Sequence, residues 1–226
     1  MRRLLPALGL LLLAPLCAEY LVGYDSSTGD PVQLLSGLLF FVPLYGAPAL
    51  LVREVARRTG MRWPGILALA AALGVLQAGV IDQSLFSESY RDIPWWEATI
   101  RPTFVEPLGI AGSNAVGFLV GHMVWSYAVP IALVEACTPG RAERPWLRVP
   151  GLVVAALLYL GAAYLILMDH LETETDHASP AQLTGALVVV AVLVTAAFTL
   201  GRRPPPRAAD RAVPRPVVVG AGSLVA

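Results

Sequence analysis

The sequence predicts an all-α polytopic transmembrane helix bundle with six spans and both termini in the cytoplasm. Composition is the first indication, because 56% of the 226 residues are hydrophobic and only 14% are charged. A membrane helix needs roughly 20 apolar residues, and six segments meet that length without the alternation of a barrel strand. These segments are residues 4–22, 32–52, 64–81, 115–137, 150–168 and 181–200.

The placement of arginine predicts the orientation. Basic residues in short loops stay on the cytoplasmic side of a membrane. All arginines except Arg91 and Arg101 precede the first segment, follow the sixth, or fall in or beside the connections between the second and third and between the fourth and fifth. The chain has no lysine, which is typical of GC-rich bacterial coding. We therefore expect a multi-pass protein of the inner, cytoplasmic membrane of a bacterial cell.

The two ends of the chain need separate interpretation. Arg2 and Arg3 before an apolar stretch also resemble a secretory signal cut after Ala18, but Leu16 stands where such a cut requires a small residue. An uncleaved first span is therefore favoured, and either outcome leaves the later orientation unchanged. We expect residues 1–201 to form the bundle and the Pro/Arg-rich residues 202–226 to form a disordered cytoplasmic tail.

A few polar residues fall inside the apolar segments, where they are costly and usually face the bundle or a wet cavity. Glu19 lies about 24 Å along the first span, Gln77 about 20 Å along the third, and His122 about 12 Å inward from the outer end of the fourth. Asp82 follows Gln77, and Ser126 lies one turn below His122. We expect these five residues to form an outward-facing pocket in which Glu19 pairs with His122. The alternative is that each residue bonds separately to a neighbouring helix or to headgroups.

Two acidic residues lie near the cytoplasmic side. Glu54 and Arg58 are one helical turn apart, which predicts an ordinary ion pair. Glu135 lies at the cytoplasmic end of the fourth span, where we expect an interfacial pair with Arg141 or another loop arginine.

Small residues and prolines predict how the helices pack. Gly117 and Gly121 form the Gly-x-x-x-Gly pattern that permits close approach of two membrane helices. Prolines inside the spans are expected to kink or break them beside a cavity. They are Pro15, Pro43, Pro48 and Pro130.

Two outer loops carry distinctive residues. The connection 82–113 is long and holds Trp95 and Trp96, which predicts an interfacial or re-entrant segment that acts as a lid or as an aromatic belt. The loop 169–177 holds four carboxylates and two histidines. Solvation explains such a loop most simply, and an extracytoplasmic zinc or calcium site is the alternative.

Phe118-x-x-x-His122 in a membrane helix resembles the second motif of the CPBP family, the CAAX-protease and bacteriocin-processing membrane proteins. The family's Glu-Glu-x-x-x-Arg motif appears as Arg53-Glu54-x-x-x-Arg58, without its first glutamate. The resemblance covers little of the chain and implies a metalloprotease scheme, in which glutamates and histidines from several helices bind metal and activate water.

Three functions remain open on the sequence alone. The first is a non-enzymatic membrane component that binds a lipid or a membrane-protein partner. The second is an intramembrane hydrolase with Glu19, Asp82 and His122 as candidate catalytic or metal-binding groups. The third is a transporter or channel subunit with a proton-linked site at Glu19 and His122. The sequence assigns no cofactor, and its zero net charge gives no indication of nucleic-acid binding.

Overall fold

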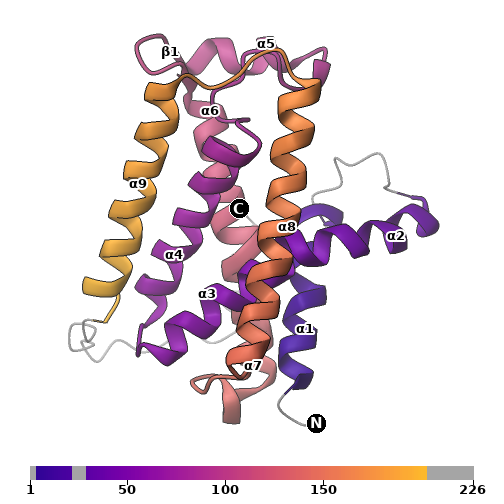
Figure 1. The fold of residues 1–226 in the computed structure, drawn as a ribbon, viewed down its shortest axis with the longest axis vertical. Helices are drawn as coiled ribbons and strands as arrows, with labels where there is room; N and C mark the ends of the chain where they lie inside the picture. Colours follow the sequence, from indigo (N-terminus) through magenta and orange to yellow (C-terminus); the bar gives the residue numbers. More distant parts are fainter. Residues whose placement is uncertain (1–3, 22–28, 203–226) are drawn as a thin grey trace, which may run out of the picture.

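The computed structural model describes residues 4–21 and 29–202 as a bundle of helices with one small hairpin (Figure 1). The α-helices are α1 (Leu4–Pro15), α2 (Pro31–Phe41), α3 (Ala47–Arg58), α4 (Trp63–Leu76), α5 (Trp96–Ile100), α6 (Gly112–Asn114), α7 (Val129–Cys137), α8 (Val149–Thr173) and α9 (Pro180–Thr199). The π-helical segments are η1 (Leu16–Tyr20), η2 (Val42–Gly46), η3 (Gln77–Ile81), η6 (Ala115–Val120) and η7 (His122–Ala128). The 3₁₀ turns are η4 (Tyr90–Asp92), η5 (Arg101–Thr103) and η8 (Pro139–Arg141), and strands β1 (Phe104–Val105) and β2 (Ile110–Ala111) pair antiparallel.

Five continuous helical runs are long and apolar enough to cross a membrane. They are Pro31–Arg58, Trp63–Ile81, Gly112–Cys137, Val149–Thr173 and Pro180–Thr199. The first predicted segment forms a shorter apolar helix, Leu4–Tyr20. The predicted all-α membrane bundle is confirmed, whereas a sixth crossing stays a prediction.

The second predicted span differs most from its expected form. The helix continues to Arg58, so Arg53, Arg57 and Arg58 belong to it and not to a loop. Figure 1 shows this helix running obliquely across α4 and α8, with α2 projecting from the bundle. Asp30 starts the helix because its Oδ1 accepts hydrogen bonds from the backbone N–H groups of residues 32 and 33, at 2.9 and 3.1 Å.

The predicted proline effects take a specific form, which is a widened helical turn. Three of the π-helical segments lie at a proline: η1 follows Pro15, η2 contains Pro43, and η7 ends just before Pro130. Proline lacks the N–H that an α-helix needs, and the neighbouring hydrogen bonds shift to wider turns. The helices therefore stay continuous through these prolines.

Glycines bring helices together, but at positions other than those predicted. A Cβ added to Gly46 would lie 2.3 Å from the Leu11 carbonyl oxygen, so the η2 backbone touches α1 directly. A Cβ on Gly74 would lie 3.2 Å from His122 Cβ, which places α4 close to η7. The predicted close approach at Gly117 and Gly121 is wrong within the described residues, because nothing lies within 4 Å of either added Cβ.

The two ends of the bundle differ in structure. The start of α1 and the connection between α7 and α8 lie at one end, and α5 and β1 lie at the other, above α4, α8 and α9 (Figure 1). We refer to residues 82–113 as the outer cap. The predicted tail lies, from residue 203 onward, outside the described residues.

Candidate functional site

The polar residues predicted to line a pocket fall in π-helical segments. Glu19 lies in η1, Gln77 in η3, and His122 and Ser126 in η7, while Asp82 follows the last residue of η3. π-Turns occur frequently at functional sites because the extra residue re-aims side chains. These segments therefore carry four of the five residues of the predicted pocket.

Gln77 and Asp82 form the part of the predicted pocket that is directly bonded. Gln77 Nε2 donates to Asp82 Oδ2 at 3.1 Å, and the Ser84 backbone N–H donates to Asp82 Oδ1 at 3.0 Å. Gln77 is only 3% exposed, and its Oε1 is buried without a hydrogen-bond partner among the described residues. Ser126 is also buried, next to Tyr127 in the same segment.

Two tyrosines that the sequence analysis did not consider complete this cluster. The hydroxyls of Tyr127 in η7 and Tyr159 in α8 are buried, and neither has a hydrogen-bond partner among the described residues. The two hydroxyls interact electrostatically with each other, and both with Asp82. A buried polar group without a partner costs about 1–3 kcal/mol. Gln77, Asp82, Tyr127 and Tyr159 are called the tyrosine cluster below.

An apolar cavity of about 280 Å³ adjoins the tyrosine cluster. It lies between α3, α4, α8 and α9, and Tyr159 forms part of its wall. Leu76 also lines it, and the next residue along the chain is Gln77. The full lining is Pro48, Leu51, Val52, Val55, Leu69, Ala72, Leu73, Leu76, Tyr159, Val190 and Val194. One residue, Tyr159, thus belongs to both the apolar cavity and the polar cluster.

Glu19 and His122 lie on neighbouring elements, because η1 packs against η7. Glu19 is 5% exposed. His122 Nδ1 donates to the Phe118 carbonyl oxygen at 2.7 Å, and the His122 ring lies 6.2 Å from the ring of Tyr45. The pairing of Glu19 with His122 stays a prediction.

The outer cap is held by acidic residues at the end of α8 and in the loop that follows it. Asp176 accepts a hydrogen bond from the backbone N–H of Glu88 at 2.6 Å, and Glu174 accepts one from the backbone N–H of Arg91 at 3.2 Å. Asp169, in α8, pairs with the Arg91 guanidinium at 3.1 Å while its side chain stays 51% exposed. These three carboxylates thus join the cap to the end of α8, and the exposure of Asp169 is compatible with the expected solvation.

The aromatic residues of the outer cap divide between its inside and its surface. Trp96 is 7% exposed and its Nε1 donates to the Ser87 carbonyl oxygen at 3.0 Å, whereas Trp95 is 63% exposed. The Trp96 ring packs against Tyr90 and Phe118. Burial raises the pKa of the Tyr90 phenol, and the Asp82 carboxylate raises it further. The cap thus has an aromatic core of its own that rests on η6.

The predicted metal alternatives need several ligands in one place. His170 and His177 stack with ring centroids 5.3 Å apart. Among the described residues, no group of three or more histidine, cysteine, aspartate or glutamate side chains could hold a metal ion. The structure therefore adds no support to a metal site at the outer loop or at Glu19, Asp82 and His122.

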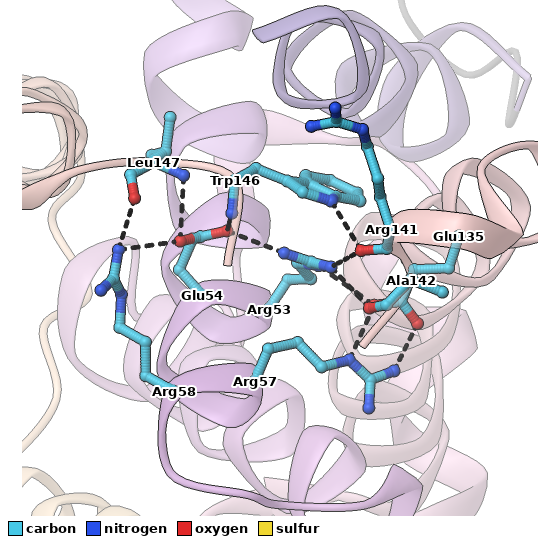
Figure 2. Close-up of polar contacts among 9 residues, drawn as sticks. All are labelled: Arg53, Glu54, Arg57, Arg58, Glu135, Arg141, Ala142, Trp146 and Leu147. Atoms are coloured by element: carbon cyan, nitrogen blue, oxygen red, sulfur yellow. Dashed lines mark hydrogen bonds and ion pairs between the residues drawn. The ribbon is translucent and has the colours of Figure 1, made fainter. Parts of the chain in front are cut away.

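A buried charged cluster occupies the opposite, arginine-rich end (Figure 2). Arg53 and Glu54 are both fully buried, and Arg53 NH1 pairs with Glu54 Oε1 at 2.8 Å. Arg53 Nε bonds Glu135 Oε1 at 3.0 Å, across from α3 to α7. The Arg57 guanidinium donates hydrogen bonds to both carboxylate oxygens of Glu135. The prediction that Glu135 pairs with a loop arginine is thus wrong in detail, since its partners lie on α3 and it is buried.

The same cluster binds the connection between α7 and α8. Arg53 NH2 donates to the carbonyl oxygens of Arg141 and Ala142, at 3.1 and 2.5 Å, and its guanidinium lies 3.5 Å from the centre of the Trp146 ring. Glu54 accepts from the Trp146 backbone N–H at 2.7 Å. The predicted Glu54–Arg58 pair is confirmed at 3.2 Å. All three nitrogens of the Arg53 guanidinium are bonded, which identifies this cluster as a structural clamp.

Comparison with known proteins gives one match. Residues 8–213 match the model of an uncharacterized membrane protein family. No curated protein and no solved structure matches the chain.

Proposed function

We propose that this chain, which belongs to an uncharacterized membrane protein family, is a lipid-binding component of the membrane and not an enzyme. It is a multi-pass membrane protein embedded in a lipid bilayer. The ligand is an amphipathic lipid, whose acyl chain occupies the apolar cavity and whose polar group bonds the tyrosine cluster. The observation that carries the proposal is Tyr159, which lines the cavity and has a buried hydroxyl without a hydrogen-bond partner among the described residues.

The size and chemistry of the cavity support an acyl chain. Small-molecule sites occupy roughly 300–1,000 Å³, so the 280 Å³ between α3, α4, α8 and α9 lies just below that range. Apart from the tyrosine ring, its walls are aliphatic or proline side chains. A pocket with walls of this kind accepts an apolar guest such as an acyl chain.

The tyrosine cluster supports a particular class of headgroup. Gln77 Oε1 and the Tyr127 and Tyr159 hydroxyls offer hydrogen-bonding capacity that the described protein atoms do not use. Asp82 forms no ion pair among the described residues. Arg91 acts on this carboxylate only from beyond ion-pair distance, so the carboxylate stays available to a ligand that carries an ammonium group. We therefore expect phosphatidylethanolamine to bind in preference to phosphatidylglycerol.

The remaining elements of the proposal follow from the sequence. We propose six spans, with Leu4–Tyr20 as the first, and an orientation that places the buried charged cluster in the cytoplasm and the outer cap outside. The inner, cytoplasmic membrane of a bacterial cell is the proposed location. The hydrolase implied by the CPBP resemblance and the proton-linked transporter are the alternative functions, and both would need Glu19 and His122 to act together.

Lipid retention by tyrosine variants tests the proposal. The double variant Tyr127→Phe/Tyr159→Phe removes two hydroxyls and leaves the cavity apolar, while Tyr164→Phe changes an exposed tyrosine of the same helix, α8. A hydrogen bond between neutral groups contributes about 0.5–1.5 kcal/mol, so two lost bonds lower affinity about tenfold. Native mass spectrometry of protein in detergent with added phosphatidylethanolamine measures this affinity.

The same variants separate a ligand site from a structural role. Because the two hydroxyls have no hydrogen-bond partner in the part of the chain that the structure describes, their removal is expected to leave the unfolding temperature of the lipid-free protein unchanged or raised. Equal phosphatidylethanolamine retention by the double variant and by Tyr164→Phe would contradict the proposal. So would a double variant that loses stability in the absence of lipid.

A further inference from the structure

A second cavity, of about 670 Å³, opens at the arginine-rich end of the bundle. It lies between the α3–α4 connection, α7 and the first residues after α7. Its lining is Arg57, Arg62, Trp63, Ala132, Glu135, Ala136, Pro139, Gly140, Ala142, Glu143 and Arg144. None of these residues belongs to the tyrosine cluster or to the apolar cavity, so the two sites are independent.

The charges of this cavity leave an excess of arginine. Glu135 is neutralised within the clamp, since Arg57 engages both of its oxygens and Arg53 engages one. The side chains of Arg62 and Arg144 form no hydrogen bond or ion pair among the described residues. Glu143 is the only carboxylate of the lining that stays unpaired in the described part of the chain. The lining therefore has two unpaired guanidinium groups, Arg62 and Arg144, and one unpaired carboxylate, Glu143, among the described residues.

The clamp makes the wall of this cavity rigid. Arg53 NH2 donates to the carbonyl oxygens of Arg141 and Ala142 (Figure 2). The Arg144 backbone N–H donates to the Arg141 carbonyl oxygen at 3.1 Å. The segment that carries Arg144 is therefore anchored to a fully buried side chain of α3. Arg62 comes from a different connection, where its backbone N–H donates to the Gly201 carbonyl oxygen at 2.9 Å. Two independently fixed backbones thus place arginines around one space.

We propose that this cavity binds a phosphate group that carries net negative charge, presented by a phospholipid headgroup or by a free phosphate. Guanidinium groups bind phosphate oxygens through paired, charge-assisted hydrogen bonds, which makes arginine the usual residue for this task. Trp63, Ala132 and Pro139 give the cavity an apolar side suited to the glycerol end of a lipid. The site differs from the tyrosine cluster in ligand charge, because that cluster is built around an unpaired carboxylate.

Two double variants of equal charge test the inference. Arg62→Ala/Arg144→Ala removes the free arginines of the cavity, and Arg148→Ala/Arg202→Ala removes two arginines of the same end that do not line it. The probes are dihexanoyl-phosphatidylglycerol, dihexanoyl-phosphatidylcholine and inorganic phosphate, titrated into full-length protein in phosphate-free detergent at low salt. The cavity variant is expected to lower affinity for phosphatidylglycerol at least about tenfold, and the control variant less than about twofold.

The probes distinguish the two sources of the phosphate group. Binding of phosphatidylglycerol without binding of inorganic phosphate identifies a lipid headgroup, and binding of both identifies a site for the phosphate group alone. Equal weakening by the two double variants would show general surface electrostatics and would overturn the inference. Failure of the wild type to bind both dihexanoyl-phosphatidylglycerol and inorganic phosphate would also overturn it. Tyr127→Phe/Tyr159→Phe is expected to leave this binding unchanged, which separates it from the proposed lipid site.

A third variant keeps the inference testable if the cavity variant folds poorly. Glu143→Gln removes the one unpaired carboxylate of the lining and adds no bulk. It is expected to raise affinity for phosphatidylglycerol by about fivefold, since a single charge near the surface contributes about 1 kcal/mol. Unchanged affinity in this variant would contradict a phosphate site at this position.

Discussion

Replacing Arg53 by alanine is expected to destabilise the protein by about 3–5 kcal/mol, because the change removes one ion-pair partner from each of two buried carboxylates, Glu54 and Glu135. Arg53 and Glu54 are fully buried, and the Glu135 side chain is 7% exposed. The substitution also frees the carbonyl oxygens of Arg141 and Ala142. Equilibrium unfolding in mixed detergent measures the loss.

Arg58→Ala is the matched control for the clamp. Arg58 pairs with the same glutamate, Glu54, but its side chain is 32% exposed, so its removal is expected to cost only about 1 kcal/mol. A loss of less than about 1 kcal/mol for Arg53→Ala, or equal losses for the two variants, would show that the buried cluster does not hold α3 to α7.

Gly46→Ala is expected to destabilise the bundle by about 1–3 kcal/mol, since the new methyl group meets backbone and not a flexible side chain. Its Cβ would lie 2.3 Å from the Leu11 carbonyl oxygen and 2.9 Å from Leu11 Cα. α1 must move away from η2 to admit it. Thermal unfolding in detergent, followed by circular dichroism, measures the effect.

Gly117→Ala is the control, and it also tests the sequence-based prediction of helix packing. No atom lies within 4 Å of its added Cβ, so alanine is expected to stabilise the helix by about 0.5–1 kcal/mol through lower backbone entropy. If Gly117→Ala destabilised the protein and Gly46→Ala did not, the close approaches described here would be wrong.

The sequence predicts the helices well because the apolar length of a span is a local property. The buried charged cluster could not be predicted in this way, because it depends on contacts between residues far apart in the sequence. Arg53 bonds Glu135, which lies 82 positions away in the sequence. In the sequence, Arg53 and Glu54 stand close to other arginines and resemble exposed charged residues at the end of a helix. The helix extends to Arg58 only because these charges neutralise one another inside the protein. Tertiary pairing of this kind leaves no periodic signal.

The polar pocket as a whole stays a prediction, because depth along a helix is only part of what forms a pocket. Gln77 and Asp82, which are close in sequence, bond each other. Depth does not specify rotation about the helix axis, so the pairing of Glu19 with His122, whose Nδ1 bonds its own helix, does not follow from depth alone. Tyr127 and Tyr159 were overlooked because tyrosine in a span resembles an interfacial residue. Their burial depends on how four helices pack.

An experimental density map of the protein in phospholipid nanodiscs tests the lipid-binding proposal most directly. The expected result is an elongated density in the cavity between α3, α4, α8 and α9, with its polar end within hydrogen-bonding distance of the Tyr159 hydroxyl. Lipid density around the exposed face of α8 and α9 serves as the internal control for lipid visibility. A map that shows those surface lipids but an empty or collapsed cavity beside Tyr159 would contradict the proposal.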